Sequence, residues 1–579
     1  MSVAIYYDGL CPFCSRYVRY LRLKEAAGSP RLVDLREAPD ERKRLEARGF
    51  DLDQGMVAEV SGRYYGGRDA VHVLALLSSR SGVFNRVNAL LFRYPFLAAL
   101  LYPVMRAFRN ATIFMMGRPS IRGDSEHNRN FFYFFSLVFG FFAIQHFTIY
   151  TFSWQPGMNW STWLLFPFGL VLFFRPDARR VFVLLLFVMA LDAWYQAPIY
   201  SNHTILKNFF LVSILLSGLW CWMRGGRWAE FSSAFVPVGR LLLLVMYFFG
   251  VFHKVNEGFL DPEVSCAVAL WEEMPAPISF LEGSFILYSA IYGTFLVEIF
   301  IALCLLIPRF RHVGIVSGIL FHSFLALSGY ALYPPFSTLS ILLHCLFLSP
   351  SAVSRILHSR EFRAFREFLV SGLGLVMLAA WLFAYMLSAY TGNNASAGIV
   401  WLLAPAGLLY LVLRYGRDAS PLHGFSLLWG RPQWINVVGI AFFLNCAAPY
   451  AGLKTAQTLN MFANLHLEGG QSNHVIMRWA PGPFGYLDDT VEIVEARGIG
   501  RFSYAAREGF HVVYYDLLDE LARNPGGRVT FIRDGKRHEH QGAQDLQAEI
   551  ERLLHPEWFR KWFHFRRVDF REPRPCGRA

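Results

Sequence analysis

The chain has 579 residues, of which 54% are hydrophobic and only 17% are charged. Soluble globular domains carry about 25% charged residues, so this composition excludes a wholly soluble protein and predicts membrane spans with soluble parts attached. The net charge of +12 fits a membrane protein with basic cytoplasmic loops. No zinc-finger spacing and no aromatic-basic motif of an RNA-binding domain is present, so we expect neither a nucleic-acid partner nor a metal.

Residues 1–115 are expected to form a thioredoxin-like α/β domain. VAIYYDG and RLVDLRE predict strands, with a helix between them that begins at the cysteines, and MVAEVSGRYYGG predicts a hairpin that turns at Ser61 and Gly62. The first residues lack the basic and apolar regions of a signal peptide, so we expect this domain in the cytosol.

Cys11 and Cys14 form a Cys-x-x-Cys pair at the start of the predicted helix. Unpaired N–H groups and the helix dipole favour a thiolate there, which indicates redox chemistry. The alternative is that the two cysteines form half of a zinc site, but no second Cys-x-x-Cys pair follows in the sequence. We expect Cys11, nearer solvent, to attack a disulfide and Cys14 to resolve the product, with a separate thiol redox partner.

The segments YYDGLCPFC and GGRDAVHVL resemble the DCC family of thiol-disulfide oxidoreductases over roughly residues 3–115. The resemblance implies a thioredoxin-like fold and a redox-active cysteine pair. Thioredoxins usually place a cis-proline opposite this pair, whereas the corresponding segment here, DQGMVAEV, contains no proline.

Apolar runs repeat after a linker over 116–130 and define a transmembrane domain over 131–453. A span needs roughly 20 residues, and we place about eleven helices, at 131–152, 158–174, 179–196, 205–223, 235–254, 285–307, 310–330, 335–350, 368–391, 398–414 and 435–453. Basic residues fill every second connecting loop. The positive-inside rule therefore predicts a cytoplasmic N-terminus and an extracytoplasmic C-terminus.

Residues 454–579 are expected to form an extracytoplasmic, β-rich α/β domain. NHVIMRW, DTVEIVEA, HVVYYDLL and GRVTFIRDGKRHEH predict strands, and DLQAEIERLL predicts a helix. The basic and aromatic segment WFRKWFHFRRVDFR is expected at the membrane interface. The predicted fold class is therefore a multi-pass α-helical membrane protein with an α/β domain at each end.

Ionisable residues inside spans are costly and usually mark function. Here the polar residues within or at the ends of spans are His146, Asp192, Asn202, His203, Lys207, Lys254, Glu298, His322 and His344. The predicted topology places Asn202, His203, Lys254 and His322 toward the outer side, where they can share one cavity. The alternatives are a snorkelling anchor for Lys254 and helix-to-helix hydrogen bonds for single histidines.

The segments SNHTIL, YFFGVFHKVNEGFLD and LFHSFLALSGYALYPPFS, in this order and spacing, resemble the vitamin K-dependent γ-glutamyl carboxylase family. The resemblance to this family, whose bacterial form is called the HTTM domain, covers roughly residues 130–475. It implies that Lys254 is the base that deprotonates reduced vitamin K or another quinol, with O2 and CO2 as co-substrates and a glutamate-containing peptide as partner. It also implies a quinone site formed by Asn202, His203, His322 and Glu298.

Burial in an apolar wall would keep Lys254 neutral, as a general base must be. Two further hypotheses fit the sequence. The chain is a membrane-anchored thiol-disulfide or quinone oxidoreductase that uses Cys11 and Cys14, or it is a non-enzymatic lipid-binding or transport protein. A transporter would be expected to contain internal sequence repeats between its halves, and none is visible in this sequence. All three hypotheses place the protein in a bacterial inner membrane with lipid and quinone as partners.

Overall fold

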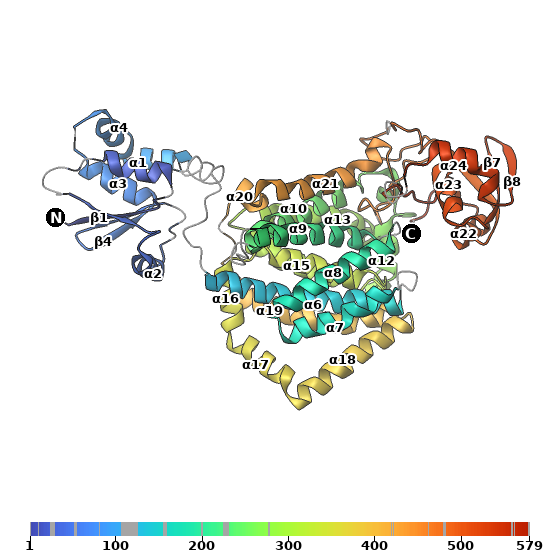
Figure 1. The fold of residues 1–579 in the computed structure, drawn as a ribbon, viewed down its shortest axis with the longest axis horizontal. Helices are drawn as coiled ribbons and strands as arrows, with labels where there is room; N and C mark the ends of the chain where they lie inside the picture. The colour runs from blue at the N-terminus through green and yellow to red at the C-terminus, as the bar shows by residue number, and fades with distance from the viewer. Residues whose placement is uncertain are drawn as a thin grey trace. The chain divides into compact units, whose positions relative to one another are not determined.

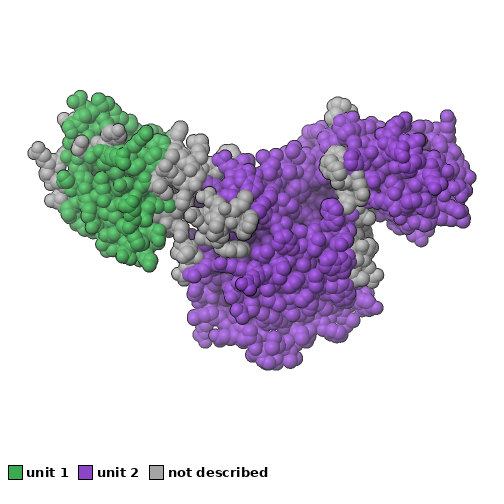
Figure 2. All heavy atoms as spheres, in the orientation of Figure 1, with its two compact units in different colours: residues 1–125 green, residues 126–579 purple. Residues whose placement is uncertain are grey.

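The structure is a computed structural model of the chain. It describes residues 2–576 except for 10, 22, 24–28, 51, 53–54, 80, 103, 106–124, 154–158, 198–200, 224–230, 276–277, 419, 421, 461, 479–481, 557–559, 561 and 572. The chain forms two compact units, Met1–Ser125 and Glu126–Ala579 (Figure 2). Most of the predicted linker over 116–130 lies outside the described residues.

The first unit contains a four-stranded sheet in the order β2-β1-β3-β4. Its strands are β1 (Val3–Tyr7), β2 (Arg31–Asp34), β3 (Val57–Val60) and β4 (Arg63–Gly66). β1 and β2 are parallel, and the other neighbours are antiparallel. Ser61 and Gly62 adopt φ values of 48° and 83° at the predicted turn, as a tight two-residue hairpin requires.

Helices cover both faces of this sheet (Figure 1). They are α1 (Pro12–Tyr20), α2 (Pro39–Ala47), α3 (Arg68–Leu77) and α4 (Val83–Phe92). Because side chains alternate along a strand, Ile5 packs in one cluster with residues of α1 and α3, whereas Tyr6 packs with Leu45 of α2 on the opposite face. The predicted thioredoxin-like arrangement is therefore confirmed.

Each of the eleven predicted spans is helical in the second unit (Figure 1). The helices are α6 (Ser125–Phe152), α7 (Trp160–Phe174), α8 (Arg179–Gln196), α9 (Asn202–Met223), α10 (Phe231–Phe252), α13 (Ser284–Leu306), α14 (Arg311–Leu325), α15 (Tyr333–Cys345), α18 (Gly372–Tyr390), α19 (Asn394–Tyr415) and α21 (Val437–Ala447). Among the described residues, seven helical segments are long and apolar enough to cross a membrane. A helical membrane protein is thus supported, but the count of eleven spans is not.

The other four helices are too short or too charged to be counted with these seven. α21 is counted because it lies within the longer helical segment Gln433–Ala451. α7 and α14 have 15 residues each and α15 has 13, while α8 carries Arg179, Arg180 and Asp192. The connecting helices are α11 (Glu257–Leu260), α12 (Cys266–Glu272), α16 (Pro350–His358), α17 (Arg360–Val370) and α20 (Phe425–Leu428).

The C-terminal part contains a second sheet, in the order β6-β5-β7-β8 and fully antiparallel. Its strands are β5 (Thr490–Arg497), β6 (His511–Val513), β7 (Arg528–Arg533) and β8 (Lys536–His540), with helices α22 (Gly500–Glu508), α23 (Tyr514–Arg523) and α24 (Gln547–Leu553). The expected strands DTVEIVEA and GRVTFIRDGKRHEH are present, and the second is a hairpin that turns at Asp534 and Gly535.

Two C-terminal strand predictions differ from the structure. In the described part of NHVIMRW, residues 473–478, His474 forms a single bridge with Asn256 rather than a strand. HVVYYDLL is a strand only in its first half, β6, and continues as α23, because a helix buries its leucines on one face. In the basic and aromatic segment, Phe563 and Phe565 are 2% and 1% exposed, so these two rings lie in the protein core, and the interfacial position of the segment stays a prediction.

Candidate functional site

The cysteine pair lies at the N-terminus of α1, as the sequence predicted. Cys11 is the N-cap residue in extended conformation, and Pro12 occupies the first helical turn, where no N–H donor is needed. The backbone N–H of Cys14 donates to the Cys11 sulfur at 3.2 Å. This donor and the helix dipole both favour a negative charge on the Cys11 sulfur.

Both cysteine side chains lie in the hydrophobic core of the first unit, with no disulfide between them. Cys11 is 0% exposed and Cys14 is 5% exposed, so the expectation that Cys11 lies nearer solvent was wrong. Cys11 is buried because its N–H bonds to the Asp8 carbonyl and its side chain folds back over the helix start. A partner can reach this sulfur only after the surrounding segment moves.

A cavity of about 320 Å³ lies among the helices of the second unit. Asn202 and His203 at the start of α9, Lys254 just after α10, Glu298 of α13 and His322 of α14 all line it. Of the nine polar residues selected in the predicted spans, the five that the carboxylase resemblance assigns to the base and the quinone site therefore line one cavity, whereas His146, Asp192, Lys207 and His344 do not. The remaining wall is mostly apolar and aromatic and includes Phe259, Trp271, Phe321, Tyr333, Phe336 and Phe462.

Lys254 and Glu298 form an ion pair inside this cavity. The Lys254 Nζ lies 2.7 Å from Glu298 Oε1, and their side chains are 12% and 10% exposed. Glu298 Oε2 has no hydrogen-bond partner among the described residues. A Cβ atom at Gly250 would lie 3.2 Å from this oxygen, so the glycine lets α10 approach the carboxylate closely. The sequence prediction of a neutral Lys254 did not include this partner.

A network of hydrogen bonds holds the turn that carries Lys254. The neighbouring His253 is 0% exposed, and its ring nitrogens lie 2.7 Å from the Tyr450 hydroxyl and 2.9 Å from the Thr458 carbonyl. Asn256 donates to the carbonyls of His253 and Ala463 and accepts from the Phe259 N–H. Lys254 therefore sits on a rigid support instead of a loose helix end.

The segment after Tyr450 closes one side of the cavity with Leu459, Phe462 and Ala463. Leu459 and Phe462 have φ values of 62° and 55°, a left-handed conformation that bulky residues adopt at a cost of about 1–2 kcal/mol each. Asn202 Oδ1 accepts the Leu459 N–H at 3.2 Å, so a predicted site residue holds this strained segment in place.

Tyr247 was not among the residues selected from the sequence. Its hydroxyl lies 3.1 Å from His322 Nε2 and 3.0 Å from His344 Nε2, and Tyr247 and His322 both line the cavity. A tyrosine inside an aromatic run carries no distinguishing signal in one sequence. The closing segment lies within PYAGLKTAQTLNMFANLHLEGG, and nothing in these residues indicates contact with α9.

A disulfide joins Cys266 at the start of α12 to Cys576 near the C-terminus. It spans 310 sequence positions, so it ties the last residues of the chain to the loop region that follows Lys254. Cys266 lies in a small core with Phe259, Tyr333 and Phe462, which also line the cavity. The tail and the cavity wall therefore share one packed support.

Residues 5–114 match the family of DCC1-like thiol-disulfide oxidoreductases. The match covers most of the first unit and includes Cys11 and Cys14, so this part of the chain is a DCC1-like thiol-disulfide oxidoreductase domain. No curated protein and no solved structure matches the chain significantly.

Proposed function

We propose that this thiol-disulfide oxidoreductase domain exchanges disulfides with a partner at the membrane, with Cys11 as nucleophile. The supporting observation is the Cys14 N–H directed at the Cys11 sulfur within the matched family region. The Cys11 thiolate attacks a disulfide sulfur of the partner, forms a mixed disulfide and expels one thiolate. Cys14 then attacks Cys11, expels the second thiol and leaves the domain oxidised and the partner reduced by two electrons.

A trapping experiment tests this assignment on the full-length chain. Cys14→Ser should accumulate a mixed disulfide through Cys11 with a disulfide-containing peptide, because the resolving thiol is gone. Cys11→Ser is the matched control and should trap nothing. Equal trapping by both variants would contradict the assignment of Cys11 as the attacking thiol.

We infer a second activity at the membrane cavity, the deprotonation of a reduced quinone by Lys254. The supporting observation is the convergence of five predicted residues around the Lys254–Glu298 pair. The aromatic and aliphatic wall suits a planar ring with a lipid-like tail, and a few polar groups suffice to orient its oxygens. Asn202, His203 and His322 are placed to bind those oxygens.

The ion pair explains how Lys254 could act as a base. Moving one proton over the 2.7 Å from Nζ to Glu298 Oε1 gives a neutral amine beside a neutral carboxylic acid. In a poorly solvated cavity this neutral pair competes with the charged pair. The amine then accepts a hydroxyl proton of the ligand and becomes an ammonium beside the ligand oxyanion, so charge is conserved.

A bound quinol would supply the acidic hydroxyl, and it would be the compound that O2 oxidises. Carboxylation of a glutamate-containing peptide with CO2 is the further reaction that the carboxylase resemblance implies. The experiment incubates the purified full-length chain with reduced quinones, O2 and labelled bicarbonate. Formation of a quinone epoxide supports the proposal, and the absence of any oxidised quinone above a Lys254→Met control contradicts it.

We propose an inner-membrane location with the N-terminus in the cytoplasm and the C-terminus outside. The alternation of basic loops supports this orientation, and so does the Cys266–Cys576 disulfide, because disulfides persist in oxidising compartments. A reporter after Ala579 should be accessible from outside and one before Met1 should not. Reporters on the same side would contradict the orientation. With this orientation, electron exchange between the two sites would need a mobile quinone.

A further inference from the structure

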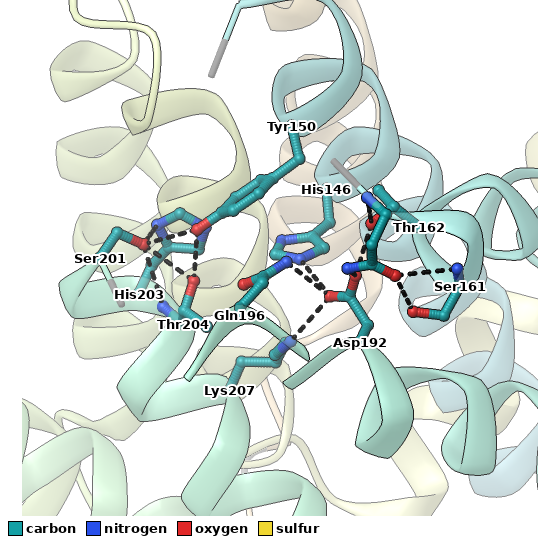
Figure 3. A network of polar contacts seen from close by, with 11 residues as sticks. His146, Tyr150, Ser161, Thr162, Asp192, Gln196, Ser201, His203, Thr204 and Lys207 are labelled. Carbon is teal, nitrogen blue, oxygen red and sulfur yellow. Dashed lines mark hydrogen bonds and ion pairs between the residues drawn. The ribbon is translucent and has the colours of Figure 1, made fainter. Parts of the chain in front are cut away.

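A cluster of polar side chains lies within the helices of the second unit (Figure 3). At its centre Asp192 of α8 is 0% exposed. Its oxygens accept hydrogen bonds from Thr162 Oγ1 at 2.6 Å and Gln196 Nε2 at 2.8 Å. His146 Nε2 lies 3.3 Å and Lys207 Nζ lies 3.7 Å from the same carboxylate. One carboxylate therefore gathers side chains from α6, α7, α8 and α9.

The cluster contains more ionisable groups than helix packing needs. With a neutral imidazole on His146, the charges of Asp192 and Lys207 cancel. Burying such a pair costs several kcal/mol per ion, and neutral amides and hydroxyls would bridge the helices without this cost. The Lys207 Nζ also has no hydrogen-bond partner among the described residues. These groups are therefore candidates for a functional role.

His203 connects the cluster to the cavity. It lines the cavity, and its Nδ1 lies 2.8 Å from Ser201 Oγ. Its ring centre lies 5.7 Å from that of His146, and the two imidazoles pack edge to face, so they are direct neighbours. In the part of the chain that the structure describes, His203 Nε2 and His146 Nδ1 lack hydrogen-bond partners. Either ring can thus gain a proton without losing an existing contact.

We propose that His146, Asp192 and Lys207 form a buried proton-binding site that is coupled to the cavity through His203. The coupling rests on the proposed quinol reaction. After the proposed reaction the Lys254 ammonium balances the ligand oxyanion only while Glu298 keeps its proton. Once Glu298 releases that proton, the Lys254–Glu298 pair carries no net charge and the anion is no longer balanced. One proton then enters the His146–His203 pair and balances the charge, and it leaves when the ligand is neutral again.

In this scheme Asp192 is a positioning residue that stabilises the imidazolium. Among the described residues, the other titratable groups around the two imidazoles are Tyr150 of α6 and Lys207 of α9, and those lining the cavity are Tyr247, Lys254, Glu298, His322, Tyr330 and Tyr333. Of these, Lys207 opposes protonation of the histidines and Asp192 favours it. Removing the Asp192 charge should therefore abolish proton binding by the histidines, while an asparagine at this position would still form hydrogen bonds.

The first test needs no ligand. Nitrogen NMR of the full-length chain with labelled histidines, with His146→Gln for assignment, follows imidazolium formation on acidification. His146 should gain a proton in the wild type but not at the same pH in Asp192→Asn. Thr162→Val is the matched control, since it removes a neutral donor from the same carboxylate and should behave like the wild type. A His146 that never gains a proton while the chain is folded, or that gains it equally in Asp192→Asn, overturns the proposal.

The second test measures the coupling to the cavity. Calorimetry in buffers of different ionisation enthalpy counts the protons taken up when neutral menadione or an anionic hydroxynaphthoquinone binds. We expect about one proton with the anion and none with menadione. Asp192→Asn should weaken binding of the anion about tenfold relative to binding of menadione, which corresponds to a difference of one pKa unit. Unchanged proton uptake in Asp192→Asn overturns the coupling. If neither compound binds the wild type, the proposed quinone site fails, and the NMR titration still decides the proton-binding site.

Discussion

The cysteine pair and the membrane cavity are built by the sequence in opposite ways. Cys11 and Cys14 lie within one helix turn, and the helix that follows them supplies the N–H donor and the dipole. The cavity draws its selected polar groups from positions between Asn202 and His322 and its closing segment from beyond Tyr450. A local motif carries most of its chemistry with it, whereas the cavity exists only where several helices pack together.

The two parts also use their cysteines differently. Cys11 and Cys14 lie at a helix start without a disulfide between them, while Cys266 and Cys576 are joined in a disulfide beside the cavity wall. This difference suggests that the first pair changes its redox state during function and the second pair supports structure. Substitutions in both parts of the chain separate these roles.

The largest effect should come from Cys11→Ser. A serine hydroxyl cannot replace the thiolate, so we expect thiol-disulfide exchange to fall by at least about 10³-fold. The assay is reduction of a disulfide peptide by the full-length chain. Cys304→Ser, which removes a thiol in α13, is the control and should exchange at the wild-type rate. A Cys11→Ser variant with more than a tenth of the wild-type rate would contradict a role for the pair in exchange.

At the cavity, Lys254→Arg should lower quinol oxidation by about 10²–10⁴-fold, the usual contribution of a general base. Arginine keeps the ion pair with Glu298 but stays charged, so it cannot pass its proton to the carboxylate. Glu298→Gln should be similarly impaired, because it removes the acceptor 2.7 Å from the lysine.

The exposed ion pair between Arg478 and Glu257 provides the control for both variants. Glu257→Gln should leave quinol oxidation near the wild-type rate, because both side chains of that pair are more than 60% exposed. Full activity in Lys254→Arg would return Lys254 to the role of a membrane anchor.

The contrast between local and assembled sites also explains what could be predicted. The strand, cysteine pair and helix of the first unit follow from short-range patterns, and they appear where expected. Asn202 and Lys254 were selectable because ionisable or polar groups stand out in apolar helices. The contact between Asn202 and Leu459, 257 positions apart, is purely tertiary and left no pattern in the sequence.

Two features depend on contacts that the sequence does not display. The segment HVVYYDLL has the composition of a strand, but burial of Leu517, Leu518 and Leu521 on one face makes its second half helical. Burial in an apolar wall was expected to keep Lys254 neutral, and this stays a prediction. Its partner Glu298 comes from a different helix, so the ion pair became visible only in the fold.

Loss of the disulfide should have an intermediate effect. In a chain with Cys266→Ser and Cys576→Ser together, the C-terminal tail should detach more readily, at a cost of roughly 2–5 kcal/mol. Hydrogen exchange of residues 562–576 would measure this, with exchange in β1 and β3 of the first unit as internal control. Since the tail and the cavity wall share a core, quinone affinity should also fall. Unchanged exchange in the tail would show that packing alone holds it.

The smallest effect is expected in α23, where two buried aspartates should respond to pH in opposite directions. Burial raises the pKa of Asp519 to about 6, and its neighbours Arg523 and Arg560 only partly offset this. Burial also opposes ionisation of Asp516, but Arg501 and His564 outweigh it and lower the pKa of that carboxyl.

The sign follows from proton linkage. Between about pH 4 and 6 the folded chain keeps a proton on Asp519 that the unfolded chain has released, so the Asp519 contribution to stability is lost as pH rises through this window. Asp519→Asn should therefore stabilise α23 at neutral pH relative to acidic pH, by up to about 3 kcal/mol. Asp516→Asn should do the reverse, since the contribution of Asp516 is present at neutral pH and lost on acidification. Hydrogen exchange of α23, corrected for intrinsic rates, measures both, and equal pH responses of the two variants would contradict the assignment.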